Sequence, residues 1–364
     1  MTRIHLIAGA RPNFMKVAPL YHALARTDWA VPVLVHTGQH YDAAMSDAFF
    51  ADLALPEPDH HLGVGSASHA HQTARVMMGY DDLCEQDPPD WVVVVGDVNS
   101  TLACALVAVK RRHPVAHLEA GLRSGDRGMP EEINRILTDQ ACDLLWAPSK
   151  DGIDNLRREG IPDHRIDLVG NVMIDSLTML WPRIAAANMP QAIGVDAYVV
   201  ATFHRPANVD DPEALATIAS ELDALAADFP VVFPLHPRTR ARLEANGRMD
   251  ALRKHPRIRL IDPLGYIDFV SLVSGAAAVV TDSGGIQEET SYLGIPCLTV
   301  RPNTERPITV TRGTNRLIDP ADIAIAARAA AAPRDRVPTE IPLWDGRTAA
   351  RVVESLRQRV DGGD

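Results

Sequence analysis

Two short, valine-rich segments with a helix between them limit most strongly what this chain can fold into. The segments are residues 91–95 and 114–118, and the apolar residues of 101–112, between them, recur at helical spacing. Short apolar runs without polar alternation are typical of parallel strands that are buried on both faces, and parallel neighbours need a crossover connection. This stretch therefore predicts two adjacent parallel strands of an α/β sheet.

Acidic residues follow both strands and open the next predicted helix. Asp97 comes just after the first strand, Glu119 follows the second, and Glu131 lies in the first helical turn behind Pro130. Ligands of open α/β sheets bind outside the carboxyl ends of the strands, so we expect these three carboxylates at one site. Each position taken alone is also what helix capping and the helix dipole favour. Three carboxylates at such positions, with glycines close by in the sequence, favour a chemical role over capping alone.

The alternation of strand and helix extends in both directions and predicts two domains. Strand-then-helix units over residues 1–175 predict a doubly wound, Rossmann-like domain, and the pattern restarts at residue 198 to give a second domain of the same class over 176–345. A length of 364 residues suits two such domains. A last amphipathic helix, at about 346–360, has the pattern to pack back on either half, and we assign it to the first.

The composition excludes several classes of function. The chain is 46% hydrophobic and 23% charged, as globular proteins are, and its formal net charge of −11 argues against nucleic acid or an acidic membrane surface as the main partner. Neither the G-x-G-x-x-G motif of dinucleotide sites nor the G-x-x-x-x-G-K-[ST] motif of P-loops occurs. We therefore expect no nicotinamide cofactor and no P-loop nucleotide, and an anionic substrate would need a local cluster of basic residues.

Cysteine and histidine spacing predicts neither disulfides nor a metal site. The cysteines lie far apart, without a C-x-x-C pair, so we expect reduced thiols in a cytoplasmic protein. They are Cys84, Cys104, Cys142 and Cys297. Adjacent His60 and His61 would point to opposite faces of a strand, which does not suit one metal ion. No apolar run approaches the roughly 20 residues of a membrane span, and the first residues lack the pattern of a secretion signal, so we expect a soluble protein.

The strand ends of the second predicted domain carry residues that bind anions. His204 and Arg205 follow one predicted strand, and together they are candidates for contacting a phosphate or assisting proton transfer. His236 follows the next strand. A later predicted strand is followed by Asp282 and then by a turn at the start of a helix. Free backbone N–H groups at a helix start favour a diphosphate. The alternative interpretation is that this turn is an ordinary N-cap. The turn consists of Ser283, Gly284 and Gly285.

Further cations lie outside these strand ends. Arg11 and Lys16 lie in the first strand-to-helix turn and the start of the following helix, where backbone N–H groups already favour an anion. That Arg11 and Lys16 are simply solvated cations on the surface is an equally good interpretation of this segment. Arg306, after the strand at 296–300, adds another anion contact. Carboxylates from one domain and anion-binding groups from the other, across a cleft between two Rossmann-like halves, suit a sugar nucleotide.

Eight motifs, in this order, resemble the non-hydrolysing UDP-N-acetylglucosamine 2-epimerases. The motifs are GARPNFMKVAPL, HTGQHYD, GDVNSTLA, HLEAGLRSGD, MPEEINRILTD, VGNVMID, FHRPANVDD and TDSGGIQEE. The resemblance covers the chain to about Gly313. It implies the glycosyltransferase-B fold, in which two Rossmann-like domains face each other across a cleft, and it implies a homodimer.

The resemblance also implies a reaction and its residues. A base removes the proton at C2 of the sugar while UDP leaves C1, and re-addition of UDP to the bound 2-acetamidoglucal gives the manno epimer without a cofactor. The acid/base carboxylates of the family jointly match Asp97, Glu119 and Glu131, and its essential histidine matches His204. Its uridine-diphosphate contacts match Arg11, Lys16, His236, Ser283, Gly284, Gly285 and Arg306, with Glu289 as the ribose ligand and Arg205 beside His204 as a further phosphate contact.

Some residues depart from the family pattern. Many relatives carry glutamate where Ala207 stands. The family's regulatory second sugar-nucleotide site uses a Gln-His pair, which Gln39 and His40 match, but the later positions of that site do not match. Activation by the substrate is therefore not assigned to this chain.

Four other functions stay open at this point. An epimerase for another UDP-2-acetamido sugar, such as a 2,3-diacetamido uronic acid, would want an extra cation near the sugar, for which Arg123 and Arg127 are candidates. A hydrolysing epimerase would release free N-acetylmannosamine and UDP. A glycosyltransferase of the same fold would need an acceptor and has no evident use for three carboxylates near C2. A catalytically silent binding protein would carry its carboxylates away from the cleft.

Overall fold

The computed structural model describes residues 1–38, 50–332 and 339–362. Their contacts form two compact units, the first comprising Met1–Met179 with Pro342–Asp364 and the second comprising Leu180–Ile341. The first boundary falls within helix α7, a few residues beyond the boundary at 175/176 that the sequence pattern suggests. Among the described residues, no helix is both long enough and apolar enough to cross a bilayer.

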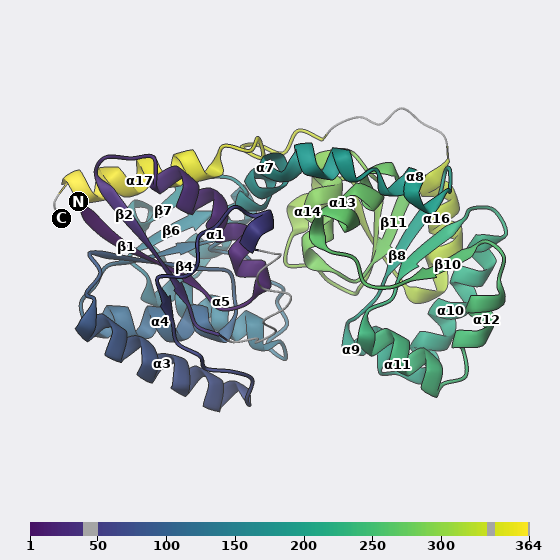
Figure 1. Ribbon diagram of the computed structural model, residues 1–364, viewed down its shortest axis with the longest axis horizontal. Helices are drawn as coiled ribbons and strands as arrows, with labels where there is room; N and C mark the ends of the chain where they lie inside the picture. The colour runs from purple at the N-terminus through teal and green to yellow at the C-terminus, as the bar shows by residue number, and fades with distance from the viewer. Residues whose placement is uncertain (39–49, 333–338, 363–364) are drawn as a thin grey trace. The chain divides into compact units, whose positions relative to one another are not determined.

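Seven parallel strands form the sheet of the first unit, in the order β3-β2-β1-β4-β5-β6-β7 (Figure 1). They are β1 (Thr2–Ala8), β2 (Ala30–His36), β3 (His60–His61), β4 (Trp91–Val95), β5 (Val115–Leu118), β6 (Leu144–Ala147) and β7 (Ile166–Leu168). The valine-rich segments form β4 and β5, with Val95 opposite Leu118, so the predicted parallel pair is confirmed. Because the two strands end at the same level, Asp97 and Glu119 leave the sheet at one edge.

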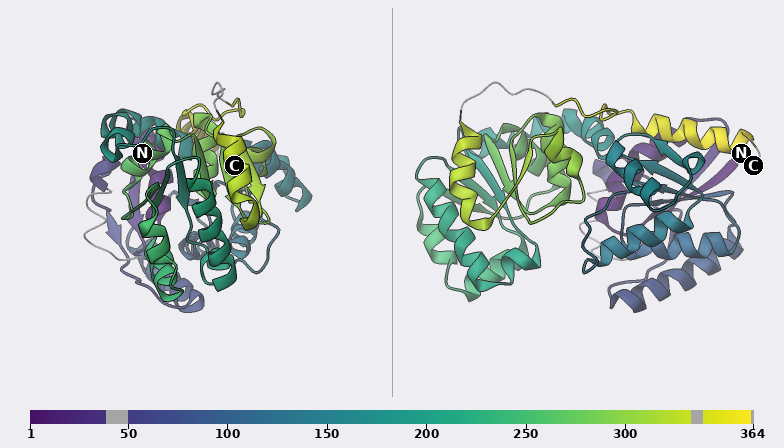
Figure 2. Two further views of the ribbon diagram at one scale, coloured as in Figure 1. Left: turned by 90° about the vertical axis from the view of Figure 1, so that its right-hand side faces the viewer. Right: turned by 180° about the vertical axis from the view of Figure 1, so that it is seen from behind.

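Helices cover both faces of this sheet. They are α1 (Arg11–Leu24), α3 (His69–Gln86), α4 (Asn99–Lys110), α5 (Pro130–Ala141), α6 (Lys150–Arg158), α7 (Val172–Ala187) and α17 (Thr348–Gly362). Apolar side chains of α3, α4 and α6 form one core cluster with β4 and β6, while α17, yellow in Figure 1 and Figure 2, packs beside α1. A hydrogen bond of 2.8 Å from Trp146 Nε1 to Ser355 Oγ fastens α17 to β6. The last helix therefore packs on the first unit.

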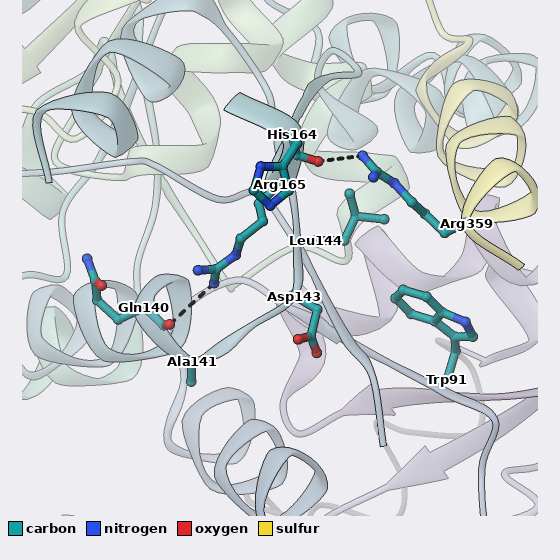
Figure 3. A pocket seen from close by; sticks show the side chains of 8 residues that line it. All are labelled: Trp91, Gln140, Ala141, Asp143, Leu144, His164, Arg165 and Arg359. Atoms are coloured by element: carbon teal, nitrogen blue, oxygen red, sulfur yellow. Dashed lines mark hydrogen bonds between the residues drawn. The ribbon is translucent and has the colours of Figure 1, made fainter. Parts of the chain in front are cut away.

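A cavity of about 340 Å³ opens at the opposite, amino-terminal edge of this sheet (Figure 3). The first residues of β4 and β6 line it, together with two arginines. Arg165 donates hydrogen bonds to the carbonyl oxygens of Gln140 and Cys142, where α5 ends, and Arg359 of α17 donates to the carbonyl oxygen of His164 at 2.7 Å. Carbonyl groups at a helix C-terminus carry partial negative charge. Both arginines thus hold chain segments together at this edge.

Six parallel strands form the sheet of the second unit, in the order β10-β9-β8-β11-β12-β13. They are β8 (Val199–Thr202), β9 (Val231–Pro234), β10 (Ile258–Ile261), β11 (Ala278–Thr281), β12 (Cys297–Val300) and β13 (Asn315–Ile318). The helices are α8 (Met189–Ile193), α9 (Pro206–Val209), α10 (Pro212–Ala226), α11 (Pro237–Ala245), α12 (Met249–Lys254), α13 (Tyr266–Gly275), α14 (Gly284–Leu293), α15 (Pro307–Thr311) and α16 (Ile323–Ala331).

Both faces of the second sheet are covered. Val199 of β8 joins one core cluster with α10 and α16, and the next residue, Val200, joins another with α13 and α14. Strands that are buried on both faces need apolar residues at every position, which explains their continuous apolar sequences. The prediction of a second Rossmann-like domain is confirmed.

Three kinds of element escape the sequence pattern. β13 has the sequence NRLI and is an edge strand whose exposed Arg316 interrupts the apolar run. The short helices α11, α12 and α16 have polar or alanine-rich sequences, so their apolar faces are hard to distinguish. β3 consists of two adjacent histidines and extends the sheet edge without an apolar run.

Candidate active site

Unusual backbone conformations shape the carboxyl edge of the first sheet. Glu119, directly after β5, has φ of +77°, in the left-handed region that non-glycine residues seldom adopt. Gly96, after β4, has φ of +67°, and a Cβ there would lie 2.9 Å from Lys16 Nζ and 3.5 Å from Glu119 Oε2. Glycine at this position leaves room for both side chains. Backbone strain of this kind is concentrated at functional sites.

A buried ion pair crosses this edge. Nζ of Lys16, from α1, contacts Oε2 of Glu119, and each of the two residues is 7% exposed. A buried charge is costly unless it is paired, so each side chain stabilises the position of the other. The sequence assigns Lys16 to UDP and Glu119 to proton transfer, and the structure brings these two predicted site residues into direct contact.

Asp97 is held by an arginine that the sequence analysis does not single out. Arg135 Nη2 and Nε lie 2.8 and 3.0 Å from Asp97 Oδ2, and Arg135 Nη1 lies 2.6 Å from Glu132 Oε2. Glu132 in turn accepts hydrogen bonds of 2.9 Å from the N–H groups of Ser124 and Gly125. The side chain of Asp97 is 29% exposed, whereas those of Arg135 and Glu132 are each 3% exposed. The carboxylate of Asp97 therefore faces outward from a buried support.

Glu131 lies on the same face of α5 as Arg135, one helical turn earlier. Its side chain is half-buried, and no hydrogen bond or ion pair joins it to the residues that the structure describes. Arg135, in the middle of α5, contacts Asp97, so this helix passes beside the end of β4. The structure thus brings Asp97 and Glu119 to one sheet edge and places Glu131 one helical turn from the arginine that holds Asp97, and the catalytic role of the three stays a prediction.

A buried histidine supports the same edge. His117, in β5, has Nδ1 2.6 Å from Asp139 and Nε2 2.8 Å from the carbonyl oxygen of Gly96. Asp139 also accepts a hydrogen bond of 3.0 Å from the N–H of Gly121. Burial by itself would raise the pKa of Asp139, but His117 and Arg123 outweigh burial and place that pKa below its ordinary value. This network fixes the turns that follow β4 and β5.

The two candidates for an extra sugar-binding cation differ in their surroundings. Arg123 lies 2.7 Å from Asp139 and 2.7 Å from Glu159, and its side chain is largely buried. Two carboxylates already engage the guanidinium group of Arg123, which disfavours it as the cation for a uronate carboxylate. Arg127 is exposed in the turn before α5 and stays a candidate.

His204 is held by a buried carboxylate in the second unit. Nδ1 of His204 lies 2.9 Å from Oδ1 of Asp282, and the His204 side chain is 41% exposed whereas that of Asp282 is 0% exposed. Asp282 also accepts hydrogen bonds from the backbone N–H of Arg205 at 2.9 Å and the side-chain amide of Asn208 at 3.2 Å. Burial would raise the pKa of Asp282, but His204 and these donors outweigh burial and lower it. Asp282 is therefore a carboxylate at neutral pH.

The N-terminus of α14 follows Asp282 directly and offers hydrogen-bond donors. Ser283 is the N-cap residue, yet its side chain makes no capping hydrogen bond. The N–H groups of Gly284 and Gly285 have no acceptor within the helix. A Cβ at Gly285 would meet no atom within 4 Å, so open space lies in front of this turn. The geometry suits the diphosphate seat that the sequence predicts.

Arg306 lies beside this turn within a network of charges. Its Nε is 2.8 Å from Glu288 Oε1, and its Nη1 is 3.1 Å from Glu305 Oε1. Arg301 lies 2.9 Å and Arg205 3.6 Å from Glu305. Burial would raise the pKa of Glu305, but Arg306 and Arg301 outweigh burial and hold that pKa well below its ordinary range. The predicted phosphate-binding cations are thus balanced here by buried carboxylates.

His236 and Glu289 also lie in this unit. Nδ1 of His236 accepts the N–H of Arg238 at 3.2 Å, and the ring centroids of His236 and His204 are 5.7 Å apart. Burial and the neighbouring His204 lower the pKa of His236, which favours a neutral ring with its proton on Nε2. Burial raises the pKa of Glu289 to about 7, and nearby Glu288 adds to the rise.

Other sequence predictions are placed as follows. The side chain of Arg11 and the pair Gln39-His40 lie outside the described residues. His60 lies 2.8 Å from Asp87, whereas His61 stacks on His36, so the two adjacent histidines have separate partners. Within residues 1–38, 50–332 and 339–362, no three His, Cys, Asp or Glu side chains are arranged to hold a metal ion.

The sequence matches one protein family over most of its length. The family is described as UDP-N-acetylglucosamine 2-epimerase, and the match spans residues 22–357. The UDP-N-acetylglucosamine 2-epimerase of Methanocaldococcus jannaschii is 41% identical over 326 residues, which cover 87% of this chain and 88% of that protein. The UDP-2,3-diacetamido-2,3-dideoxy-D-glucuronate 2-epimerase of Pseudomonas aeruginosa is 40% identical over 359 residues, which cover 97% of this chain and 99% of that protein.

A solved structure is similar to this fold over both units. It is the crystal structure of the Methanocaldococcus jannaschii UDP-GlcNAc 2-epimerase in complex with UDP-GlcNAc and UDP. The TM-score is 0.87 at 38% sequence identity, and the aligned residues cover 98% of this chain and 99% of that chain.

Proposed function

This chain belongs to the UDP-N-acetylglucosamine 2-epimerase family, and from that premise we propose that it interconverts UDP-N-acetylglucosamine and UDP-N-acetylmannosamine. The observation that carries this proposal is that Asp97 and Glu119 leave the first sheet at one edge, with Glu131 one helical turn from the arginine that holds Asp97. An epimerase has to remove a proton from one face of a carbon and return a proton to the other face. More than one acid/base group at the same edge supports that task.

The chemistry at C2 of the sugar depends on the bond at C1. The C2 proton is not next to a carbonyl group, so it is released only as the C1–O bond breaks and C1 gains positive charge. A carboxylate takes the proton, and the C1–O electron pair leaves with the diphosphate to give UDP and a 2-acetamidoglucal. Re-addition of UDP to C1, with a proton delivered to the other face of C2, gives the epimer. The overall reaction requires neither an oxidant nor a reductant.

The first unit supplies the proton-transfer groups in this proposal. Asp97 faces outward and is held by Arg135, which fixes its position for a directed transfer. Glu131 has no fixed partner among the described side chains and can move to meet the substrate. Glu119 is the third carboxylate and is oriented by Lys16. We assign the two proton transfers at C2 to the three carboxylates jointly.

The second unit holds UDP in this proposal. The N–H groups of Gly284 and Gly285 bind the diphosphate at the positive end of α14, and Arg306 lies next to them. Glu289 binds the ribose. His204 and the N–H groups stabilise the negative charge that develops on the departing diphosphate, where preorganised donors have their largest effect.

The test is incubation with UDP-N-acetylglucosamine in deuterium oxide, followed by NMR of the C2 position. We expect the manno epimer to appear with deuterium at C2. Epimerisation without deuterium at C2 would contradict the elimination route. Accumulation of free N-acetylmannosamine and UDP would indicate a hydrolysing epimerase, and transfer that requires an added acceptor would indicate a glycosyltransferase.

One observation favours a second substrate. The Pseudomonas aeruginosa relative, named for a diacetamido glucuronate, aligns with 97% of this chain, compared with 87% for the Methanocaldococcus jannaschii relative. The exposed Arg127, in the turn before α5, would supply the cation for a uronate carboxylate. The same deuterium assay, run side by side with both UDP-sugars and compared by kcat/KM, decides between the two substrates.

We further propose that the enzyme is a cytoplasmic homodimer. Its four cysteines are buried free thiols, which suits a reducing compartment. Met78, Val109 and Leu137 expose apolar side chains on α3, α4 and α5, helices that pack next to one another (Figure 1). Exposed apolar side chains on neighbouring helices support contact with a second copy. Light scattering of the purified protein measures the oligomeric state.

A further inference from the structure

We propose that Asp282 is a positioning residue that keeps a proton on Nδ1 of His204, so that Nε2 of His204 is the atom that exchanges a proton with the departing diphosphate. This inference rests on the function proposed above. Neither the sequence pattern nor the family resemblance gives Asp282 a role of its own. The argument comes from the contacts of this carboxylate.

The contrast in burial separates the two partners. Asp282 is fully buried at the end of β11 and cannot reach a ligand itself, whereas His204 is exposed at the end of the neighbouring strand β8. Only Nδ1 of the His204 ring is engaged, at 2.9 Å from Asp282 Oδ1. No other hydrogen bond joins this ring to the described part of the chain. Nε2 is therefore the ring nitrogen available to a substrate.

The donors around Asp282 fix its state and its orientation. Its oxygens accept hydrogen bonds from the backbone N–H groups of His204 at 3.1 Å and Arg205 at 2.9 Å, and from Asn208 Nδ2 at 3.2 Å. A carboxylate surrounded by donors stays ionised and can only accept. The ring nitrogen that faces it must therefore carry the proton, and the imidazole has one tautomer, with hydrogen on Nδ1 and a lone pair on Nε2 when it is neutral.

This arrangement gives His204 a defined part in the reaction. As the C1–O bond breaks, its electron pair moves to the phosphate oxygen, and the imidazolium form of His204 donates its Nε2 proton to that oxygen. The C2 proton goes to a carboxylate of the first unit. On re-addition Nε2 takes the proton back from the diphosphate oxygen, and a carboxylate of the first unit delivers a proton to the other face of C2. Nδ1 keeps its proton throughout because Asp282 accepts from it. The buried carboxylate also holds the ring in one orientation, as in other histidine–carboxylate pairs.

Replacing Asp282 with asparagine changes one contact selectively. The amide oxygen of the introduced asparagine satisfies the two donors Arg205 N–H and Asn208 Nδ2 when it occupies the position of Oδ2. The amide NH₂ group then takes the position of Oδ1 and faces Nδ1 of His204. Two donors cannot form a hydrogen bond, so the neutral ring shifts its proton to Nε2. Asp282→Asn therefore inverts the tautomer of His204 while most of the backbone contacts persist.

The experiment measures the tautomer and the turnover separately. In ¹⁵N-histidine-labelled protein at a pH where the ring is neutral, NMR identifies the signals of His204 by their loss in His204→Gln. We expect the Nδ1–H tautomer in the unsubstituted protein and the Nε2–H tautomer in Asp282→Asn. We expect Asp282→Asn to lower C2 deuteration by roughly 10²- to 10⁴-fold, the contribution of general acid–base catalysis. UDP binding by calorimetry should change much less.

Asp211→Asn is the matched control. Asp211 also accepts a backbone N–H in the second unit, from Glu213 at 2.9 Å, but it has no histidine partner in the described part of the chain, and asparagine is an equally good N-cap. This variant should keep the activity and the His204 tautomer. A loss of thermal stability in Asp282→Asn alone would not explain an inverted tautomer, so the NMR readout distinguishes positioning from a structural role.

The outcomes separate this inference from the proposed function. An Nε2–H tautomer in the unsubstituted protein overturns the inference, and this measurement needs no Asp282 variant to fold. Turnover retained in Asp282→Asn within a few-fold also overturns it. If the unsubstituted protein shows no C2 deuteration with any UDP-sugar tested, the proposed function fails, and with it the assigned reaction step, whatever the tautomer is.

Discussion

Ion pairs lie at the carboxyl edge of each sheet, and the two edges differ in whether the base or the acid is the supporting partner. In the first unit, basic side chains from helices hold carboxylates at the strand ends: Lys16 contacts Glu119, and Arg135 contacts Asp97. The cations are buried, and Asp97 faces outward. The side chain that this edge exposes is an acid.

The second unit reverses this order. Asp282 is buried and holds the exposed His204, while Glu288 and Glu305 contact Arg306. The groups presented by this edge are bases and backbone donors. The comparison teaches that one fold can expose opposite charges at its strand ends, because the buried partner fixes the sign of the charge that faces outward.

The largest expected effect tests whether the first unit does chemistry and the second binds. Asp97→Asn and Glu131→Gln should each lower turnover by roughly 10²- to 10⁴-fold, because each removes a proton acceptor. UDP affinity, measured by calorimetry, should change little, because the predicted diphosphate seat lies in the second unit. Asp163→Asn is the control: it also breaks an aspartate–arginine pair of the first unit, but an exposed one, at 2.7 Å from Arg157. The division of roles fails if UDP affinity collapses while turnover at saturation is unchanged.

A second experiment tests whether Lys16 and Glu119, at the carboxyl edge of the first sheet, form an energetically coupled ion pair. Glu119→Gln leaves the buried ammonium group of Lys16 without its counter-charge, so we expect the free energy of unfolding to fall by roughly 3 kcal/mol. The double variant Lys16→Met and Glu119→Gln should recover much of this loss, because it removes the buried charge itself. Urea unfolding of the two single variants and the double variant gives the coupling. Additive losses would contradict a coupled pair.

The smallest effect concerns Glu289, whose buried carboxyl belongs to the second edge. Its pKa is raised from 4.5 to about 7. An acid with a raised folded-state pKa contributes stability that is present below its unfolded pKa and is lost as the pH rises through the folded pKa. Between pH 5 and pH 8, the unfolding free energy of the unsubstituted protein should fall by roughly 2–3 kcal/mol relative to that of Glu289→Gln.

Urea unfolding of both proteins at the two pH values measures this difference. Glu131→Gln is the matched control, because it makes the same glutamate-to-glutamine substitution at a half-buried position of the first unit. A constant stability difference between Glu289→Gln and the unsubstituted protein across this range would mean that the pKa of Glu289 is not raised. The carboxyl group of Glu289 would then be ionised at pH 6.

The strands and the polar side chains at their ends were predictable because both depend on short stretches of sequence. Buried parallel strands need continuous apolar residues, and the polar residue that ends such a run leaves the sheet at its carboxyl edge. Asp97, Glu119 and His204 were identified in this way. Edge strand β13 was missed, because a strand that is partly exposed tolerates polar residues and loses the pattern.

The partners of these residues were not predictable from such stretches. Arg135 is 38 residues from Asp97, Lys16 is 103 residues from Glu119, and Asp282 lies 78 residues from His204. Arg123, a candidate ligand in the sequence, proved to be engaged by two carboxylates. Nothing in the residue order distinguishes a surface arginine from one that a fold buries against an acid.

The amino-acid sequence was thus sufficient to establish the alternation of strands and helices, the two-domain organisation and the positions of the polar side chains at strand ends, since periodicity and turn chemistry act over a few residues. The three-dimensional packing established which of those side chains are buried, which charges are paired and which ring nitrogen of His204 faces outward. Burial and ion pairing join segments that are remote in the chain, and their energies depend on distances of a few ångströms that arise only when the chain is folded.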